Sequence, residues 1–97
     1  MDDKIQTLHP EPGKTNKRID RDKYDVVRAA ILKALQPGAM SHTELKNAVA
    51  KLLGPDFDGG AAWYNETVKL DLEARGEVER FKEGTRLLFR VAKVGRK

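Results

Sequence analysis

The sequence predicts a small α+β domain in which three helices are followed by a C-terminal β-hairpin. Apolar residues recur at helical spacing in three successive segments, and Gly76 ends the third of them. Apolar residues alternate with polar ones on both sides of Glu83-Gly84, as in a hairpin with one buried face. The order helix, helix, helix, hairpin is typical of a winged helix-turn-helix domain, with the hairpin as its wing.

The composition limits the size and class of the protein. A chain of 97 residues is long enough for one domain with one modest core. The absence of cysteine excludes disulfides, thiolate metal ligands and cysteine nucleophiles. The chain shows no secretory signal, and it has no apolar run near the ~20 residues that span a bilayer. We therefore expect a soluble, cytoplasmic protein with no membrane partner.

Three parts are predicted along the chain. Residues 1–19 contain two prolines and a glycine without helical or alternating periodicity, which indicates an extended or partly disordered N-terminal arm. Residues 20–92 form the winged-helix domain. Residues 93–97 form a basic tail.

The first two helices have clear start and stop signals. The first begins at Asp20, a good N-cap, and ends before Pro37-Gly38. Its apolar face comprises Tyr24, Val27, Ile31 and Leu35. The second begins with a capping box, in which Ser41 and Glu44 satisfy opposing backbone amides, and ends at Gly54-Pro55. A very short strand is predicted at Ala39-Met40, and Phe57 is expected to pack into the core.

The third helix is predicted from about Gly60 to Arg75. It has two apolar arcs, and Asp71 lies between them. Because an unpaired buried carboxylate is costly, Asp71 either pairs with Arg75 one turn later or faces a partner. Trp63 likewise either packs in the core or under the arm, or it contacts a partner. Trp63 and Asp71 are therefore the candidate partner-binding residues.

The hairpin is predicted to turn at Glu83-Gly84. Glutamate tolerates a positive φ poorly, so we expect a three-residue loop with Gly84 in the left-handed position. This register places Val78 opposite Phe89 and Glu77 opposite Arg90.

No pattern for catalysis or cofactor binding withstands inspection. Gly13-Lys14-Thr15 lacks the preceding glycine of a phosphate-binding loop, and Asp56 starts no complete calcium loop. The two histidines, His9 and His42, lie in separate segments without further ligand types around them. We predict no catalytic residues, no metal site, no cofactor and no small-molecule ligand.

The charge distribution suggests nucleic acid as a partner. The net charge is +4, and residues 77–97 carry seven basic and three acidic groups. The candidate DNA contacts are Arg80, Lys82, Arg86 and Arg90 on the wing, with Asn65 and Lys69 on the solvent face of the third helix. Glu66 and Glu73 on the same helix would repel phosphate. The sequence therefore leaves two functions open: binding of double-stranded DNA mainly through the wing, or protein interaction as a homodimer.

A resemblance adds to this interpretation. The run from Asp71 to Val78, DLEARGEV, resembles the junction of recognition helix and wing in many bacterial winged-helix regulators. Over most of the chain, His9-Pro10, Trp63-Tyr64 and residues 68–76 are similar to a small bacterial family of uncharacterised winged-helix-like proteins. The resemblance implies the winged-helix-like fold and no established activity. The leading function predicted from the residues is that of a bacterial DNA-binding or transcription-associated module that uses the wing.

Overall fold

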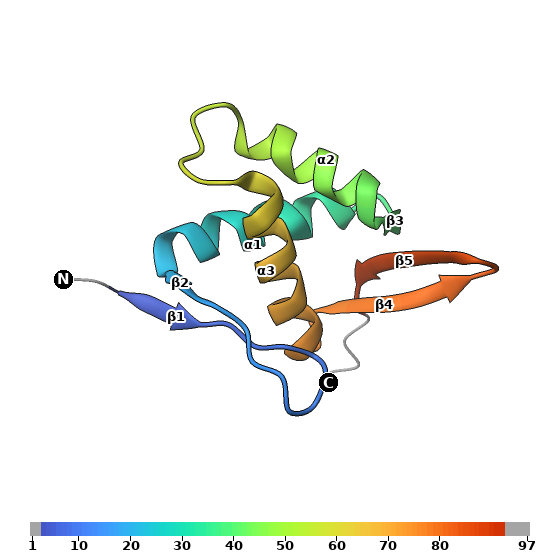
Figure 1. Cartoon of the computed structure of the whole chain (residues 1–97). Helices are drawn as coiled ribbons and strands as arrows, with labels where there is room; N and C mark the ends of the chain where they lie inside the picture. Colours follow the sequence, from blue (N-terminus) through green and yellow to red (C-terminus); the bar gives the residue numbers. More distant parts are fainter. Residues whose placement is uncertain (1–2, 93–97) are drawn as a thin grey trace.

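The computed structural model describes residues 3–92, which form three helices and two small antiparallel sheets (Figure 1). The helices are α1 (Arg21–Leu35), α2 (His42–Leu53) and α3 (Ala61–Ala74). The strands are β1 (Lys4–Gln6), β2 (Arg18–Asp20), β3 (Met40–Ser41), β4 (Val78–Glu83) and β5 (Arg86–Val91). The prediction of a mixed α+β chain with three helices is therefore confirmed. The predicted basic tail lies outside the described residues.

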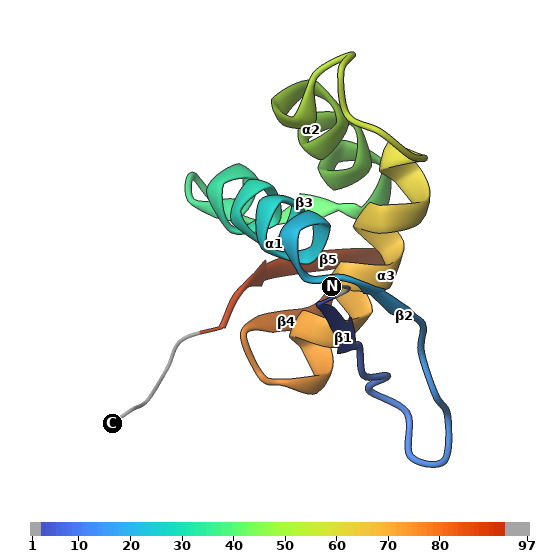
Figure 2. The same cartoon turned by 90° about the vertical axis from the view of Figure 1, so that its left-hand side faces the viewer.

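The three helices pack against one another and against one face of a sheet with strand order β3-β5-β4 (Figures 1 and 2). The predicted apolar face of α1 is buried: Val27 and Ile31 are fully inaccessible, and Tyr24 and Leu35 nearly so. From α2, Leu45 and Val49 enter the same core, and from α3, Val68 and Leu72. Phe57 packs against this cluster, as expected.

The helix boundaries follow the local signals in the sequence. The capping box at the start of α2 is confirmed, because Ser41 Oγ accepts from the Glu44 amide and Glu44 Oε1 accepts from the Ser41 amide. The backbone hydrogen bond from Ser41 is the main cause that lowers the pKa of Glu44. Asp20 precedes α1 but makes no capping bond; its carboxylate instead accepts from Lys4 Nζ at 3.0 Å. Gly76 adopts φ +80° directly after α3 and ends it.

Residues 4–20 contain two strands that the sequence pattern did not indicate. β1 and β2 pair antiparallel, and Ile5 lies opposite Ile19. We call β1, β2 and the connecting residues 7–17 the N-terminal ribbon. Of the two predicted states, extended and partly disordered, the extended one describes these strands. The ribbon lies beside the C-terminal half of α3 (Figures 1 and 2), in contact with it through hydrogen bonds of Leu8 and Asn16.

The C-terminal hairpin, β4 and β5, projects from the helices (Figure 1). The predicted register is wrong by two residues, because Val78 pairs with Val91 and Arg80 with Phe89. The loop is the two-residue Gly84-Thr85, flanked by the pair Glu83 and Arg86. Gly84 has φ +64°, and among the described residues only glycines have a positive φ. This pattern fits a type II′ turn, which needs glycine only at its first central position and spares Glu83 from a strained conformation.

Candidate interaction surfaces

The carboxylate of Asp71 is buried and joins three segments of the chain, so it is not exposed to a partner. Its side chain is inaccessible, and its oxygens accept hydrogen bonds from the Leu8 amide at 2.8 Å and from Tyr24 Oη. Arg75 Nε donates to both oxygens, at 2.9 and 2.8 Å. The predicted pairing with Arg75 is confirmed, and the alternative of exposure at an interface is wrong. One carboxylate thus connects α3, α1 and the N-terminal ribbon.

The ionisation of this junction is set by its burial and its partners. Burial is the main cause that raises the pKa of Tyr24 far above its ordinary value, and the hydrogen bond to Asp71 adds to it. The same carboxylate raises the pKa of Arg75 through its hydrogen bond. Tyr24 is therefore a neutral donor and Arg75 a permanent cation at any physiological pH.

The N-terminal ribbon covers one side of α3. Asn16 Nδ2 donates to the carbonyls of Leu8 and Thr67, at 2.9 and 3.0 Å. The Thr7 hydroxyl and amide both bond to the Lys17 carbonyl, which closes the base of the loop. The sequence alone did not predict this contact, because its partners lie far apart in the chain. The only local sign was an acidic residue, Asp71, between two apolar arcs.

The two residues predicted to read DNA bases from α3 are not on its solvent face. Asn65 is fully buried and Lys69 is 2% exposed. The helix faces α2 and β5 at these positions: Lys69 Nζ lies 3.1 Å from His42 Nδ1 and 4.1 Å from the ring centre of Phe89. The prediction of exposure is wrong because the side of the third helix that was assigned to solvent, with Asn65 and Lys69, is the side that packs inward.

The buried end of Lys69 has polar neighbours. Its ammonium lies 3.1 Å from Glu66 Oε1 and forms an ion pair with it, although this oxygen accepts no hydrogen bond among residues 3–92. His42 Nδ1 is 3.7 Å from the same oxygen. Within residues 3–92 the side-chain amide of Asn65 has no hydrogen-bond partner for either of its polar atoms. Among these residues, no cluster of three or more histidine or acidic side chains is placed to hold a metal ion.

Two of the four hairpin cations predicted to contact DNA are held in ion pairs within the chain. Arg80 Nε bonds to Glu73 at 2.9 Å, and Arg90 Nε to Glu79 at 2.7 Å. Arg90 also lies over the ring of Phe81, 4.0 Å from its centre. The pairing of Arg90 with Glu77 is wrong, because the shifted register brings Glu79 opposite it.

The other two hairpin cations, Lys82 and Arg86, are less constrained. Arg86 lies 3.7 Å from Glu44, and both side chains are about three-fifths exposed, at 62% and 57%. No acidic group of residues 3–92 comes within ion-pair distance of the exposed Lys82. Residues 77–92 hold four basic and three acidic groups, so most of the basic surplus belongs to residues 93–97. The hairpin itself is nearly neutral.

Trp63 lies near the N-terminal end of α3, the end away from the hairpin, and is 48% exposed. Its ring meets that of Tyr64 edge-on at 5.0 Å between centres, and Tyr64 meets Phe57 in the same way at 5.4 Å. Lys23 Nζ lies 5.4 Å from the centre of the Tyr64 ring. We call Phe57, Trp63 and Tyr64 the aromatic cluster. Of the alternatives left open by the sequence, packing under the arm is wrong, since Trp63 faces solvent.

The loop before α3 is shaped to hold this cluster. Gly59 has φ +121°, and a Cβ there would lie 2.7 Å from Cε2 of Tyr64. Only glycine permits so close an approach of the backbone to the tyrosine ring. The indole of Trp63 is therefore exposed on a fixed base and not on a loose chain end.

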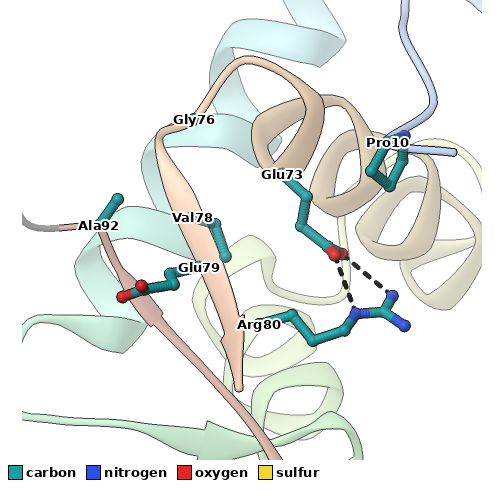
Figure 3. Close-up of a pocket in the computed structure, with 7 residues that line it drawn as sticks. All are labelled: Pro10, Glu73, Gly76, Val78, Glu79, Arg80 and Ala92. Carbon is teal, nitrogen blue, oxygen red and sulfur yellow. Dashed lines mark hydrogen bonds and ion pairs between the residues drawn. The ribbon is translucent and has the colours of Figure 1, made fainter. Parts of the chain in front are cut away.

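A shallow hollow of about 410 Å³ lies where α3, β4 and the N-terminal ribbon meet. Figure 3 shows its lining, with Glu73 and Arg80 pointing toward one another across it and Pro10 from the ribbon beside them. The Glu73 side chain is only 5% exposed, whereas that of Arg80 is 45% exposed. A second hollow, of about 210 Å³, shares Pro10, Glu73 and Arg80 and continues past Leu70.

These features define an α+β domain with three helices. Within residues 3–92 it has no cluster of side chains that could hold a metal ion. The chain belongs to a family of unknown function, DUF6958, whose model matches residues 4–88. No curated protein matches the chain. No solved structure matches it either. No helix among the described residues is long and apolar enough to cross a bilayer.

Proposed function

We propose that the chain is a protein-interaction module on a winged-helix scaffold, and that it self-associates through Trp63. The order α1, β3, α2, α3, β4, β5, with β3 completing the sheet of the hairpin, supports the winged-helix assignment. A bacterial origin and a cytoplasmic location stay predictions from the sequence.

The proposal rests on one observation: one end of α3 is covered by the rest of the chain, whereas the other end exposes an aromatic side chain. The C-terminal half is covered by the N-terminal ribbon and its polar groups are engaged. The N-terminal end exposes the indole of Trp63 on the aromatic cluster. Tryptophan is enriched among residues that dominate binding energy, and a rigid base lowers the entropy lost on contact.

The unique tryptophan supplies the test, because all indole fluorescence comes from Trp63. Self-association that buries this ring should shift its emission to the blue as concentration rises, with a parallel increase in sedimentation coefficient. Trp63→Ala should abolish the sedimentation change. The matched control is Val26→Ala, because Val26 is an equally exposed apolar residue on α1. Constant emission and sedimentation over the whole concentration range would reject self-association.

A second function has its own support in the tip of the hairpin. Lys82 is exposed and unpaired among residues 3–92, and the contact of Arg86 with Glu44 is long. We propose as the alternative that these cations contact the phosphates of duplex DNA, together with the basic residues of the tail. The groove-reading role of Asn65 and Lys69 has no part in this alternative, because both are buried.

Salt separates the two functions. Phosphate contacts release counterions, so DNA affinity should fall steeply from about 50 to 200 mM salt, by a slope near −0.9 for each phosphate neutralised. Anisotropy of a labelled generic duplex measures this. Lys82→Ala with Arg86→Ala should reduce the slope, whereas Lys33→Ala with Lys51→Ala, two exposed helix cations, should change it little. Absence of DNA binding at low salt eliminates the alternative.

A further inference from the structure

The outer edge of β4 carries backbone groups that no strand of residues 3–92 satisfies. β4 is the last strand in the order β3-β5-β4. The Ala92 amide donates to the Glu77 carbonyl at 3.0 Å, so this pair is of the hydrogen-bonded kind. Such pairs alternate in an antiparallel ladder, so every second residue of β4 bonds to β5. The N–H and C=O groups of Val78, Arg80 and Lys82 therefore point away from β5.

There is space for another chain along this edge. The hollow beside the start of β4 is open, and it is bordered by Gly76, Val78 and the ribbon residue Pro10. Figure 3 shows the Arg80 side chain drawn toward Glu73 on α3, away from the strand axis. The remainder of β4 lies on the projecting part of the hairpin (Figure 1).

A second copy of this chain is a poor occupant of the edge. A twofold pairing of β4 with itself places residues of the same sheet face opposite one another. The three central registers then bring Arg80 opposite Arg80, Arg80 opposite Lys82, or Lys82 opposite Lys82. Like charges directly opposite destabilise an antiparallel pair. Such charges on an edge strand oppose self-pairing, so the edge fits a chain of different sequence.

We propose that the edge of β4 accepts an extended segment of another protein as a fourth strand, with an acidic residue opposite Lys82 and an apolar residue opposite Phe81. Backbone hydrogen bonds would supply affinity, and the two side-chain positions would supply selectivity. Within β4, Arg80 is paired with Glu73, and Lys82 is the exposed cation that has no ion-pair partner among residues 3–92. Phe81 is half-buried, and the guanidinium of Arg90 covers its ring.

The spacing of these two residues defines the motif. Phe81 and Lys82 are consecutive, so they point to opposite faces of the sheet. The residues opposite them in an added strand are also consecutive. The preferred partner therefore carries an adjacent apolar and acidic residue within an extended segment free of proline.

This inference goes beyond the proposed self-association, because it concerns a different surface and a different partner. Trp63 and β4 lie at opposite ends of α3, which spans 14 residues or about 21 Å. Fluorescence of Trp63 reports on one surface and the amides of β4 report on the other. Failure of self-association and failure of strand addition are therefore separate results.

The test uses a blocked seven-residue peptide of alternating valine and threonine with one central aspartate, added to the full-length labelled chain. Amide hydrogen exchange by NMR should slow at Val78, Arg80 and Lys82 when the peptide binds. The amides of Glu79 and Phe81 already bond to β5 and should change little. The same peptide with lysine in place of aspartate should bind at least several-fold more weakly.

Two variants separate backbone pairing from charge attraction. Lys82→Pro removes one outward N–H, and proline is tolerated at such edge positions, so protection by the peptide should be lost. Lys82→Ala keeps the N–H, so protection should persist with several-fold weaker affinity. If Lys82→Pro disturbs the hairpin, the unmodified chain is tested with a peptide N-methylated at alternate amides, which should not bind. Unchanged exchange at all three outward amides at millimolar peptide, or equal slowing of inward and outward amides, overturns the proposal.

Discussion

The two β-ribbons of this protein differ in how they are held. The N-terminal ribbon has only three pairs in its ladder, yet its loop is fixed to α3 by hydrogen bonds from Leu8 and Asn16. The C-terminal hairpin has six pairs and projects from the helices, with an edge on β4 that no strand of residues 3–92 pairs. One ribbon is attached through a distant buried carboxylate, whereas the other combines its own turn and cross-strand contacts with the burial of Val78 and Phe89 in the core. Local sequence pattern and tertiary attachment are thus separate sources of order in this chain.

The largest expected effect tests the attachment of the N-terminal ribbon. Asp71→Ala removes the acceptor shared by Leu8, Tyr24 and Arg75 and leaves their donors unpaired. We expect a loss of about 3–5 kcal/mol in the free energy of unfolding, measured by urea denaturation. Asp25→Ala, at an exposed position of α1, should cost less than about 0.5 kcal/mol.

The same variant shows whether the carboxylate holds the ribbon in particular. In Asp71→Ala, amide exchange at Thr7 and Leu8 should accelerate more than exchange in β4 and β5. Equal acceleration in both ribbons would contradict the view that they are held independently.

The next effect concerns Tyr24 and pH. Its raised pKa means that the folded state retains the hydroxyl proton more strongly than the unfolded state does. This contribution is complete below the ordinary tyrosine pKa of about 10 and declines as pH rises through the folded-state pKa. Tyr24→Phe should cost about 1–3 kcal/mol at pH 7, since it removes a hydrogen bond to a buried carboxylate.

Denaturation at neutral and alkaline pH checks this sign. The stability difference between the unmodified chain and Tyr24→Phe should be constant up to about pH 9 and narrow above about pH 10. A difference that widens with pH would show that the tyrosine is not the donor in this contact.

A smaller effect is expected at the turn of the C-terminal hairpin. Gly84→Ala places a side chain at φ +64°, where no atom lies within 4 Å of the new Cβ. The cost is therefore conformational, about 1–2 kcal/mol. Thr85→Ala is the control, because it leaves the glycine unchanged. Accelerated exchange confined to β4 and β5 is expected, and accelerated exchange in the N-terminal ribbon would argue for coupling between the two ribbons.

The smallest effect concerns the surface pair Glu79 and Arg90, whose side chains are each 47% exposed. Replacement of Glu79 by glutamine should cost about 0.2–1 kcal/mol and less at high salt. Urea denaturation at two salt concentrations measures it. A loss independent of salt would indicate packing of the Glu79 stem and not charge attraction.

The sequence was sufficient to predict those elements whose position depends on nearby residues. Helical periodicity identified all three helices, the capping box located the start of α2, and Gly76 marked the end of α3. These signals depend on residues within one or two turns of each other. The turn at Gly84 was located to within one residue, and that single error shifted the whole register of the hairpin.

The candidate site was less predictable because it depends on contacts between distant segments. The burial of Lys69 requires the positions of His42 and Phe89, which only the packed helices and sheet supply. The helical wheel of α3 gave two apolar arcs but could not show which side the ribbon covers. The pairing of Asp71 with Arg75 was accessible because its partner is four residues away, and its bond to Leu8 was not.

The bond between Leu8 and Asp71 also orders events during synthesis of the chain. The two residues are 63 positions apart, so the ribbon cannot dock until nearly all of α3 has been translated. At about 5–20 residues per second, this interval lasts roughly 3–13 s. During that time the short strands β1 and β2 must remain soluble without their support. Their charged residues Lys4, Arg18 and Asp20 favour a hydrated segment during the time before α3 is complete.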